Sequence, residues 1–440
     1  MRILSITAGA ANMYCGSCLR DNALAAELLA KGHQVTLLPL YTPTLTDEPN
    51  VSAPNRVLFG GVSVYLEQHM PLFRHTPRWL DRLWDSTTAL KALARQSIRT
   101  DPRMLGEMTV SMLKGEDGHQ RKEFEKMREW LASEPAPDIV NLPNTLLISL
   151  ARPLRRMLHR PICCTLQGED LFIEGLPEPY RRQALDLIRR QVENVDVFIS
   201  VSHSYAEPMA SYFGIPRDRI AVVPLGINVA GYDAPPRAAN PEFTVGFFAR
   251  VAPEKGLHEL CEAYRILRRE LGVPAARLEA AGYLAHAHRP YLERLQQLMA
   301  THGLGGEFRY HGTLERDEKI AYLRGLDVLS VPGPFPDPKG MYLLEAMAAG
   351  TPVVQPRRGA YPEVIGRTGG GLLVEEGPAG LAEGLLQLYR DRDLASRLGA
   401  QGAAGVRAHY SIAQSAASLL NVYGRACARE PVSPEMTRVS

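Results

Sequence analysis

The 440-residue chain has few cysteines and no long apolar run. Its six cysteines are too sparse for a disulfide framework, which excludes a small disulfide-stapled scaffold. No stretch approaches the roughly 18 apolar residues that a membrane-spanning helix needs, and the beginning MRILSITAGA lacks the pattern of a signal peptide. A net charge of only +2 argues against a dedicated nucleic-acid partner. We therefore expect a cytoplasmic globular protein.

The length exceeds that of a single hydrophobic core, so two domains are expected. Strand-like and helix-like segments alternate, which favours parallel sheets covered by helices on both faces. The expected strands are residues 3–7, 35–38, 139–142, 162–166, 197–201 and 220–223, then 243–248, 277–281, 308–311, 328–331, 352–355 and 372–374. The expected helices include residues 22–30, 145–158, 179–194, 257–271, 291–301, 317–324, 381–389 and 412–429.

A stretch rich in Pro, Ala and Asn, NVAGYDAPPRAANP at 228–241, predicts the linker between the domains. The predicted domains are 1–232 and 240–410, with a last helix at about 411–430 that returns to the first domain. Residues from about 67 to 132 depart from the strand–helix rhythm and are interpreted as a helical insertion in the first domain. Within it, RWLDRLWD at 78–85 could contact a membrane surface, although packing of an inserted helix is the favoured interpretation.

The stretch DPKGMYLLEAMAAGTPVV at 337–354 predicts a helix that begins near Gly340 and ends at Gly350. A helix N-terminus provides unpaired backbone N–H groups and is an anion site. Glu345 lies in the apolar part of this helix, where a carboxylate needs partners. Its offset from Gly340 is roughly 7–8 Å at 1.5 Å per residue, which suits a diphosphate at the helix start and a hydroxyl group beside the second turn.

Arg250 and Lys255 follow the first strand of the predicted second domain, at the sheet edge where open α/β sheets bind ligands. A planar guanidinium and a compact ammonium suit a diphosphate. A solvated basic loop is the alternative for this pair. Two cysteine pairs, Cys15/Cys18 and Cys163/Cys164, could form a metal or redox site, but independent thiols are the favoured interpretation.

With these motifs the chain resembles the retaining, nucleotide-sugar-dependent glycosyltransferases of family 4. Their GT-B fold has two doubly wound Rossmann-like domains that face a cleft, with a C-terminal helix that crosses back to the first domain. The shared motifs are RVAPEKG at 250–256, LLEAMAAGTPVV at 343–354, GAYPEVI at 359–365, GGGLLV at 369–374, LAAELLAKGHQVTLL at 24–38, APDIVNLPN at 136–144 and IAVVPLGIN at 220–228. Part of the insertion, VSVYLEQHMPLF, is similar to the glycogen- and starch-synthase branch.

The resemblance implies roles for particular residues. Arg250 and Lys255 would neutralise the donor diphosphate, and Glu345 would accept the ribose hydroxyls. The catalytic set is Arg250, Lys255, Asp337 and Glu345, and the donor-binding set is Gly16, Gly312, Leu314, Gly340, Met341 and Leu344. Within the donor set, backbone at 312–314 would meet the nucleobase, and the amides near the helix start would bind phosphate. Gly16, expected in the loop after the first strand, would let backbone approach the phosphate or the acceptor.

Two positions depart from the family pattern. Asp337 stands where the family has Glu, beside the transferred sugar, and Lys339 replaces an aromatic residue. The first-domain motif ends in Gln167 rather than His, and Gln can bind a hydroxyl but cannot act as acid or base. Glu169 and Asp170 complete the acceptor-side set, although a solvated loop is expected for both.

The expected activity is hexosyl transfer from a nucleotide-diphosphate sugar to a glycan, lipid or small-molecule acceptor. The expectation includes retention at the anomeric carbon, no metal or other cofactor, and a cytoplasmic location or one at the inner membrane face. The alternatives are a catalytically weak relative that binds nucleotide sugar as a sensor or scaffold, and a GT-B enzyme of another type such as a nucleotide-sugar epimerase. Sugar, nucleobase, acceptor and oligomeric state are left open.

Overall fold

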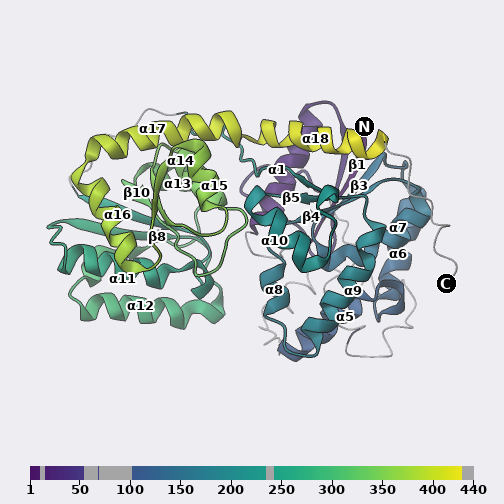
Figure 1. Ribbon diagram of the computed structural model, residues 1–440, viewed down its shortest axis with the longest axis horizontal. Helices are drawn as coiled ribbons and strands as arrows, with labels where there is room; N and C mark the ends of the chain where they lie inside the picture. Colours follow the sequence, from purple (N-terminus) through teal and green to yellow (C-terminus); the bar gives the residue numbers. More distant parts are fainter. Residues whose placement is uncertain (10–14, 54–67, 69–101, 234–241, 429–440) are drawn as a thin grey trace. The chain divides into compact units, whose positions relative to one another are not determined.

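A computed structural model describes residues 1–9, 15–53, 68, 102–233 and 242–428 (Figure 1). The chain divides into two units by spatial proximity. The first unit comprises Met1–Val201, Ala206–Val223 and Ala416–Ser440, and the second comprises Ser202–Tyr205 and Pro224–Ser415. Within the described ranges, no helix combines the length and apolar character needed to cross a membrane.

The first unit is built on six parallel strands in the order β2-β1-β3-β4-β5-β6. The strands are β1 (Arg2–Thr7), β2 (Gln34–Pro39), β3 (Ile139–Leu142), β4 (Ile162–Leu166), β5 (Val197–Ser200) and β6 (Ile220–Val222). Strands β3, β4 and β5 are buried along their whole length, as expected for parallel strands covered on both faces. The strand order reverses between β1 and β3, so this is the switch point of the sheet.

Helices cover the first sheet and form the described part of the insertion. They are α1 (Gly16–Ala30), α5 (Pro102–Leu113), α6 (Arg121–Ser133), α7 (Ala151–Leu158), α8 (Asp170–Glu174), α9 (Tyr180–Gln191), α10 (His203–Phe213) and α18 (Ile412–Ala428). Short 3-10 turns occur at η2 (Gly115–Asp117), η3 (Thr145–Leu150), η4 (Val192–Asn194) and η5 (Arg217–Arg219). Most of α18 belongs to the first unit, where its Tyr423 is buried beside Cys163 of β4.

The second unit repeats the architecture, with six parallel strands in the order β12-β11-β10-β7-β8-β9. The strands are β7 (Phe243–Phe248), β8 (Ala276–Ala281), β9 (Phe308–Tyr310), β10 (Val328–Leu329), β11 (Val353–Pro356) and β12 (Gly371–Val374). The helices are α11 (Leu257–Arg269), α12 (Arg289–Thr301), α13 (Arg316–Arg324), α14 (Met341–Ala348), α15 (Tyr361–Thr368), α16 (Pro378–Arg390) and α17 (Arg392–His409). The 3-10 turns are η6 (Pro253–Lys255), η7 (His286–His288) and η8 (Gly305–Glu307). The switch point lies between β7 and β10.

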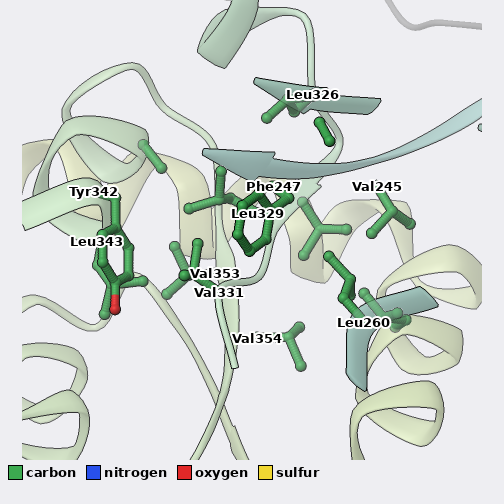
Figure 2. Close-up of a cluster of buried hydrophobic side chains, with 14 of the residues drawn as sticks. Val245, Phe247, Leu260, Leu326, Leu329, Val331, Tyr342, Leu343, Val353 and Val354 are labelled. Atoms are coloured by element: carbon green, nitrogen blue, oxygen red, sulfur yellow. The ribbon is translucent and has the colours of Figure 1, made fainter. Parts of the chain in front are cut away.

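Helix α14 is anchored to this sheet by its apolar side chains. Figure 2 shows Leu343 and the ring of Tyr342 in the same cluster as Phe247 of β7, Leu329 of β10 and Val353 of β11. Leu343, Phe247, Leu329 and Val353 have no exposed surface. Helix α14 packs on α13 and α17, while α11 packs on α12 and α16. The first turn of α14 is therefore held in a fixed position at the carboxyl end of β10.

These features confirm the predicted fold class of two doubly wound α/β units with a last helix that returns to the first. The predicted start of helix 22–30 is wrong, because α1 begins at Gly16. Helices α10, α15 and α17 were not predicted. The segment 78–85 and most of the predicted linker lie outside the described residues.

Candidate functional site

The switch point of the second sheet brings together two of the predicted catalytic residues. Lys255 ends turn η6 after β7, and Asp337 lies in the segment between β10 and α14. Lys255 Nζ lies 2.7 Å from Asp337 Oδ2, although the residues are 82 positions apart in sequence. Ligands of open α/β sheets bind in the crevice at such a point. The sequence placed Lys255 at this sheet edge, and the structure adds its direct ion pair with Asp337.

Asp337 is held by its own segment as well as by Lys255. Its Oδ1 accepts hydrogen bonds from the backbone N–H groups of Lys339 at 2.9 Å and Gly340 at 3.1 Å, and its Oδ2 accepts one from the Tyr342 hydroxyl at 3.1 Å. Burial alone would raise the pKa of this carboxyl group. The charge of Lys255 and the hydrogen bonds outweigh burial, so the pKa lies well below its usual range and Asp337 is ionised.

The start of α14 retains the properties of an anion site. Gly340 precedes the helix with φ +61°, a left-handed conformation. Its N–H donates to Asp337. The N–H groups of Met341 and Tyr342 have no acceptor within the described ranges. Two backbone donors at the helix start and the ammonium of Lys255 therefore remain available to bind a phosphate beside Asp337.

Arg250 lies on the same segment after β7, and its side chain is 43% exposed. Its Nη2 pairs with Glu254 Oε1 at 2.5 Å, one turn further along the chain. An exposed pair of this kind is weak and can exchange partners. Arg250 is thus able to turn toward an anionic ligand at small energetic cost.

Glu345 is buried in the second turn of α14, as the sequence indicated, with 8% of its surface exposed. Its Oε1 accepts a hydrogen bond from Lys319 Nζ of α13 at 2.8 Å. The sequence analysis missed Lys319. The available signal was its spacing of four residues from the apolar Leu323, which places both on the buried face of α13.

Two tyrosines absent from the predicted site connect its elements. The hydroxyls of Tyr342 and Tyr361 lie 2.7 Å apart, and Tyr361 is the donor of this pair because the Tyr342 proton is directed to Asp337. Burial raises the pKa of both hydroxyl groups, so both remain protonated donors. The hydrogen bonds from Tyr361 to Tyr342 and from Tyr342 to Asp337 hold the carboxylate in place within the second unit.

The remaining donor-side predictions have different outcomes. Leu344 has no exposed surface, and its N–H points back to the carbonyl of Gly340, so its side chain belongs to the core and is not offered to a ligand. Gly312 and Leu314 are partly exposed after β9, and the Gly312 carbonyl accepts from the N–H of Gly282. Gly16 is the first residue of α1, not part of the preceding loop.

The acceptor-side residues lie at the carboxyl end of β4 in the first unit. The predicted solvated loop is wrong for Glu169, which is only 5% exposed. Its oxygens accept hydrogen bonds from the N–H and hydroxyl of Thr145, both at 3.1 Å, and from the N–H of Gln167 at 2.8 Å. Burial raises the pKa of the Glu169 carboxyl group, and these donors oppose the rise only in part. Asp170 is partly exposed and begins helix α8 instead of lying in a loop.

The side chain of Gln167 is directed toward the loop that follows β3. Its Nε2 donates to the carbonyl of Pro143 at 2.6 Å. Its Oε1 is buried and has no donor within the part of the chain that the structure describes. A buried acceptor atom without a donor is unfavourable, so a ligand hydroxyl that reached it would be stabilised.

The cysteines form no recognisable centre. None of the six is in a disulfide, and Cys163 and Cys164 are buried on β4. The described ranges contain no group of three or more His, Cys, Asp or Glu side chains that could hold a metal ion.

Comparisons with known proteins agree with this arrangement. Residues 232–404 match the model of the glycosyl transferases group 1, and residues 113–230 match that of Glycosyltransferase Family 4. The sucrose-phosphate synthase of Thermosynechococcus elongatus has a similar fold, with a TM-score of 0.68 at 18% identity over 97% of this chain and 98% of that chain.

Two curated relatives are similar over a shorter region. One is the GDP-mannose-dependent alpha-(1-6)-phosphatidylinositol monomannoside mannosyltransferase of Mycobacterium tuberculosis, 29% identical over 52% of this chain and 61% of the relative. Another is the D-inositol 3-phosphate glycosyltransferase of Pseudarthrobacter chlorophenolicus, 30% identical over 55% and 59%. The chain thus spans about three fifths of the length of these relatives.

The two doubly wound units and the returning helix α18 define the fold as that of the GT-B glycosyltransferases. The two family matches lie in these two units, at residues 113–230 and 232–404. By these matches, residues 232–404 belong to the glycosyl transferases group 1 and residues 113–230 to Glycosyltransferase Family 4.

Proposed function

We propose that the protein transfers a hexose from a nucleotide-diphosphate sugar to an acceptor, with retention at the anomeric carbon. The observation that supports this best is the meeting of Lys255, Asp337 and the first turn of α14 at the switch point. The curated relatives that match this chain are named for the same reaction type, one of them with GDP-mannose as donor.

In this mechanism the second unit binds the donor diphosphate. Lys255, Arg250 and the N–H groups of Met341 and Tyr342 offset the negative charge that grows as the diphosphate leaves. Glu345, fixed by Lys319, accepts the ribose hydroxyls. Cationic side chains and a helix start perform the neutralisation that a divalent cation performs elsewhere, so we propose a reaction independent of metal and of other cofactors.

The acceptor binds to the first unit in this proposal. The bond between the anomeric carbon and the diphosphate oxygen breaks, and a bond from that carbon to the acceptor oxygen forms on the same face. The acceptor proton passes to the departing phosphate oxygen, which makes a catalytic His unnecessary. Gln167 Oε1, which lacks a described donor, accepts from an acceptor hydroxyl and orients it.

A donor panel tests the proposal. The protein is incubated with GDP-mannose, UDP-glucose, UDP-N-acetylglucosamine and ADP-glucose, with and without acceptors, and nucleoside diphosphate release is measured in the presence of a chelator. Release that Lys255→Met abolishes and the chelator leaves unchanged is the expected result. Loss of release with the chelator would refute metal independence. Tight nucleotide binding without release from any donor would refute the transferase.

That last outcome would favour a second function, nucleotide-sugar binding as a sensor or scaffold. The observation that favours it is the inward position of Asp337. Its carboxylate already occupies Lys255 and two backbone donors, instead of being presented to a sugar. The Arg250, Lys255 and Glu345 set also suits a nucleotide-sugar epimerase, which would be recognised by an altered sugar still attached to its nucleotide.

A further inference from the structure

A cavity of about 180 Å³ lies at the carboxyl edge of the first sheet. Ala8 follows β1, Tyr41 lies two residues after β2, and Asn144 lies two residues after β3. The sheet order reverses between β1 and β3, so the cavity opens at the switch point of the first unit. It occupies the position at which open α/β sheets bind ligands.

Most of the rest of its wall is hydrocarbon and thioether. Helix α5, from the described part of the insertion, contributes Leu105, Met108 and Met112, and α8 contributes Phe172. Positions 105, 108 and 112 follow one face of the helix over seven residues, or about 10.5 Å at 1.5 Å per residue. The cavity is thus lined along an apolar stripe longer than a single aromatic ring. Methionine side chains adapt readily to the shape of an apolar group.

The polar atoms of this wall are mostly engaged. Asn144 Oδ1 accepts from the N–H of Leu146 at 3.1 Å, and the Thr109 hydroxyl donates to the carbonyl of Leu105 at 2.8 Å. Tyr41, which also lines the cavity, brings a phenolic hydroxyl group to this part of the first unit. Burial raises the pKa of this hydroxyl, so it stays protonated. The cavity therefore offers a largely apolar surface with a polar contact at one point.

The cavity is joined to the acceptor-side residues by a shared loop. Gln167 donates to the carbonyl of Pro143, and Glu169 accepts from Thr145. Asn144, which lies between these two loop residues, and Leu146 line the cavity. A ligand hydroxyl near Gln167 could thus belong to the same molecule as an apolar group in the cavity.

We propose that the acceptor carries an alkyl chain and that this cavity binds the chain next to the hydroxyl that is glycosylated. That the ligand is a sugar acceptor rests on the proposed function, whereas the binding of an alkyl chain in this cavity does not. The length of the α5 stripe favours an extended chain over a ring. The engaged polar atoms disfavour a second sugar at this position, because a buried sugar would leave its hydroxyls unpaired.

Calorimetry with methyl, butyl, hexyl and octyl glucosides, below their micelle concentrations and without nucleotide, tests the subsite. About 0.8 kcal/mol per buried methylene corresponds to a fourfold gain in affinity for each added carbon. We expect this gain until the chain fills the cavity, followed by a plateau. Affinity independent of chain length would overturn the proposal, and so would a phenyl glucoside that binds as tightly as the hexyl compound.

A pair of matched variants on α5 tests whether the alkyl chain binds in this cavity. Met108→Glu places a charge in the cavity wall and should remove the chain-length dependence. Met104→Glu makes the same change one turn earlier, at a residue that is not part of the cavity wall, and should preserve the dependence. Equal loss in both variants would overturn the assignment. GDP and UDP affinity, measured separately, tests the donor site, so failure of the proposed function and failure of the subsite are distinguishable.

Discussion

Replacing Lys319 tests how much the buried pair beneath the candidate donor site contributes. The side chains of Lys319 and Glu345 are 5% and 11% exposed, and 2.8 Å separates Nζ from Oε1. Removing one partner of such a pair leaves the other charge buried without it, which costs about 3–5 kcal/mol. Lys319→Met keeps the length of the side chain and removes only the charge, so a new cavity contributes little to the change.

The expected result is a lower melting temperature. For a unit of about 150–250 residues, 1 kcal/mol corresponds to roughly 2–4 °C, so 3–5 kcal/mol corresponds to about 6–20 °C. Glu345→Gln should cost a similar amount. The double variant, Lys319→Met with Glu345→Gln, leaves neither charge and should cost less than the sum of the two single changes by at least about 2 kcal/mol.

Thermal or urea unfolding of wild type, the two single variants and the double variant gives the coupling energy between Lys319 and Glu345. Titration with GDP and UDP, at a temperature where all four proteins are folded, tests whether Glu345 binds the nucleotide. If Glu345 accepts the ribose hydroxyls, Glu345→Gln weakens nucleotide binding. Lys319→Met also weakens it, because it removes the group that fixes the carboxylate. A single-variant cost under 1 kcal/mol, or additive costs, would refute the argument from burial. Unchanged nucleotide affinity in Glu345→Gln would refute the ribose contact.

Three further predictions concern the residues around the helix start. Asp337→Asn should destabilise the protein by about 1–3 kcal/mol at neutral pH. Because the folded pKa of Asp337 is lowered, this stability difference from wild type should be constant above about pH 5. It should decrease progressively below about pH 4, toward the lowered pKa of the folded state, which urea titrations at several pH values would show. Arg250→Ala should weaken nucleotide binding yet change the free energy of unfolding by under about 1 kcal/mol, since its exposed pair with Glu254 is weak; a larger stability change would make Arg250 structural. Gly340→Ala should cost about 1–2 kcal/mol, because φ +61° is unfavourable for any residue with a Cβ, and unchanged stability would mean that the turn can relax.

The strands were predictable because parallel strands buried on both faces are continuous apolar segments. Strand β4, Ile162–Leu166, is buried at every position and agrees with the prediction residue for residue. Helix α17, Arg392–His409, was missed because its several glycines lower its helix propensity. The structure supplies the reason for one of them. A Cβ at Gly399 would lie 2.1 Å from the carbonyl oxygen of Gly350, so close packing requires glycine there at the expense of propensity.

The candidate site was predictable as single residues but not as pairs. Residue type and sheet edge indicated Lys255 and Glu345, whereas their partners lie 82 and 26 positions away in the sequence. The same limit explains the error at Glu169. A carboxylate in a Gly-Glu-Asp segment is solvated by default, and only the approach of Thr145, 24 residues earlier, makes its burial favourable.

Asp337 shows why a departure of one methylene matters. Its Oδ1 accepts from the N–H groups two and three residues further along the chain, a local arrangement that Asp side chains favour. A glutamate would carry its carboxylate one methylene further from these donors. The shorter side chain therefore keeps its charge on the N–H groups of Lys339 and Gly340 and on Lys255, and the proposed function gives Lys255 to the diphosphate as well. A donor phosphate must share Lys255 with Asp337, so the residue that departs from the family pattern competes with the phosphate for this ammonium group.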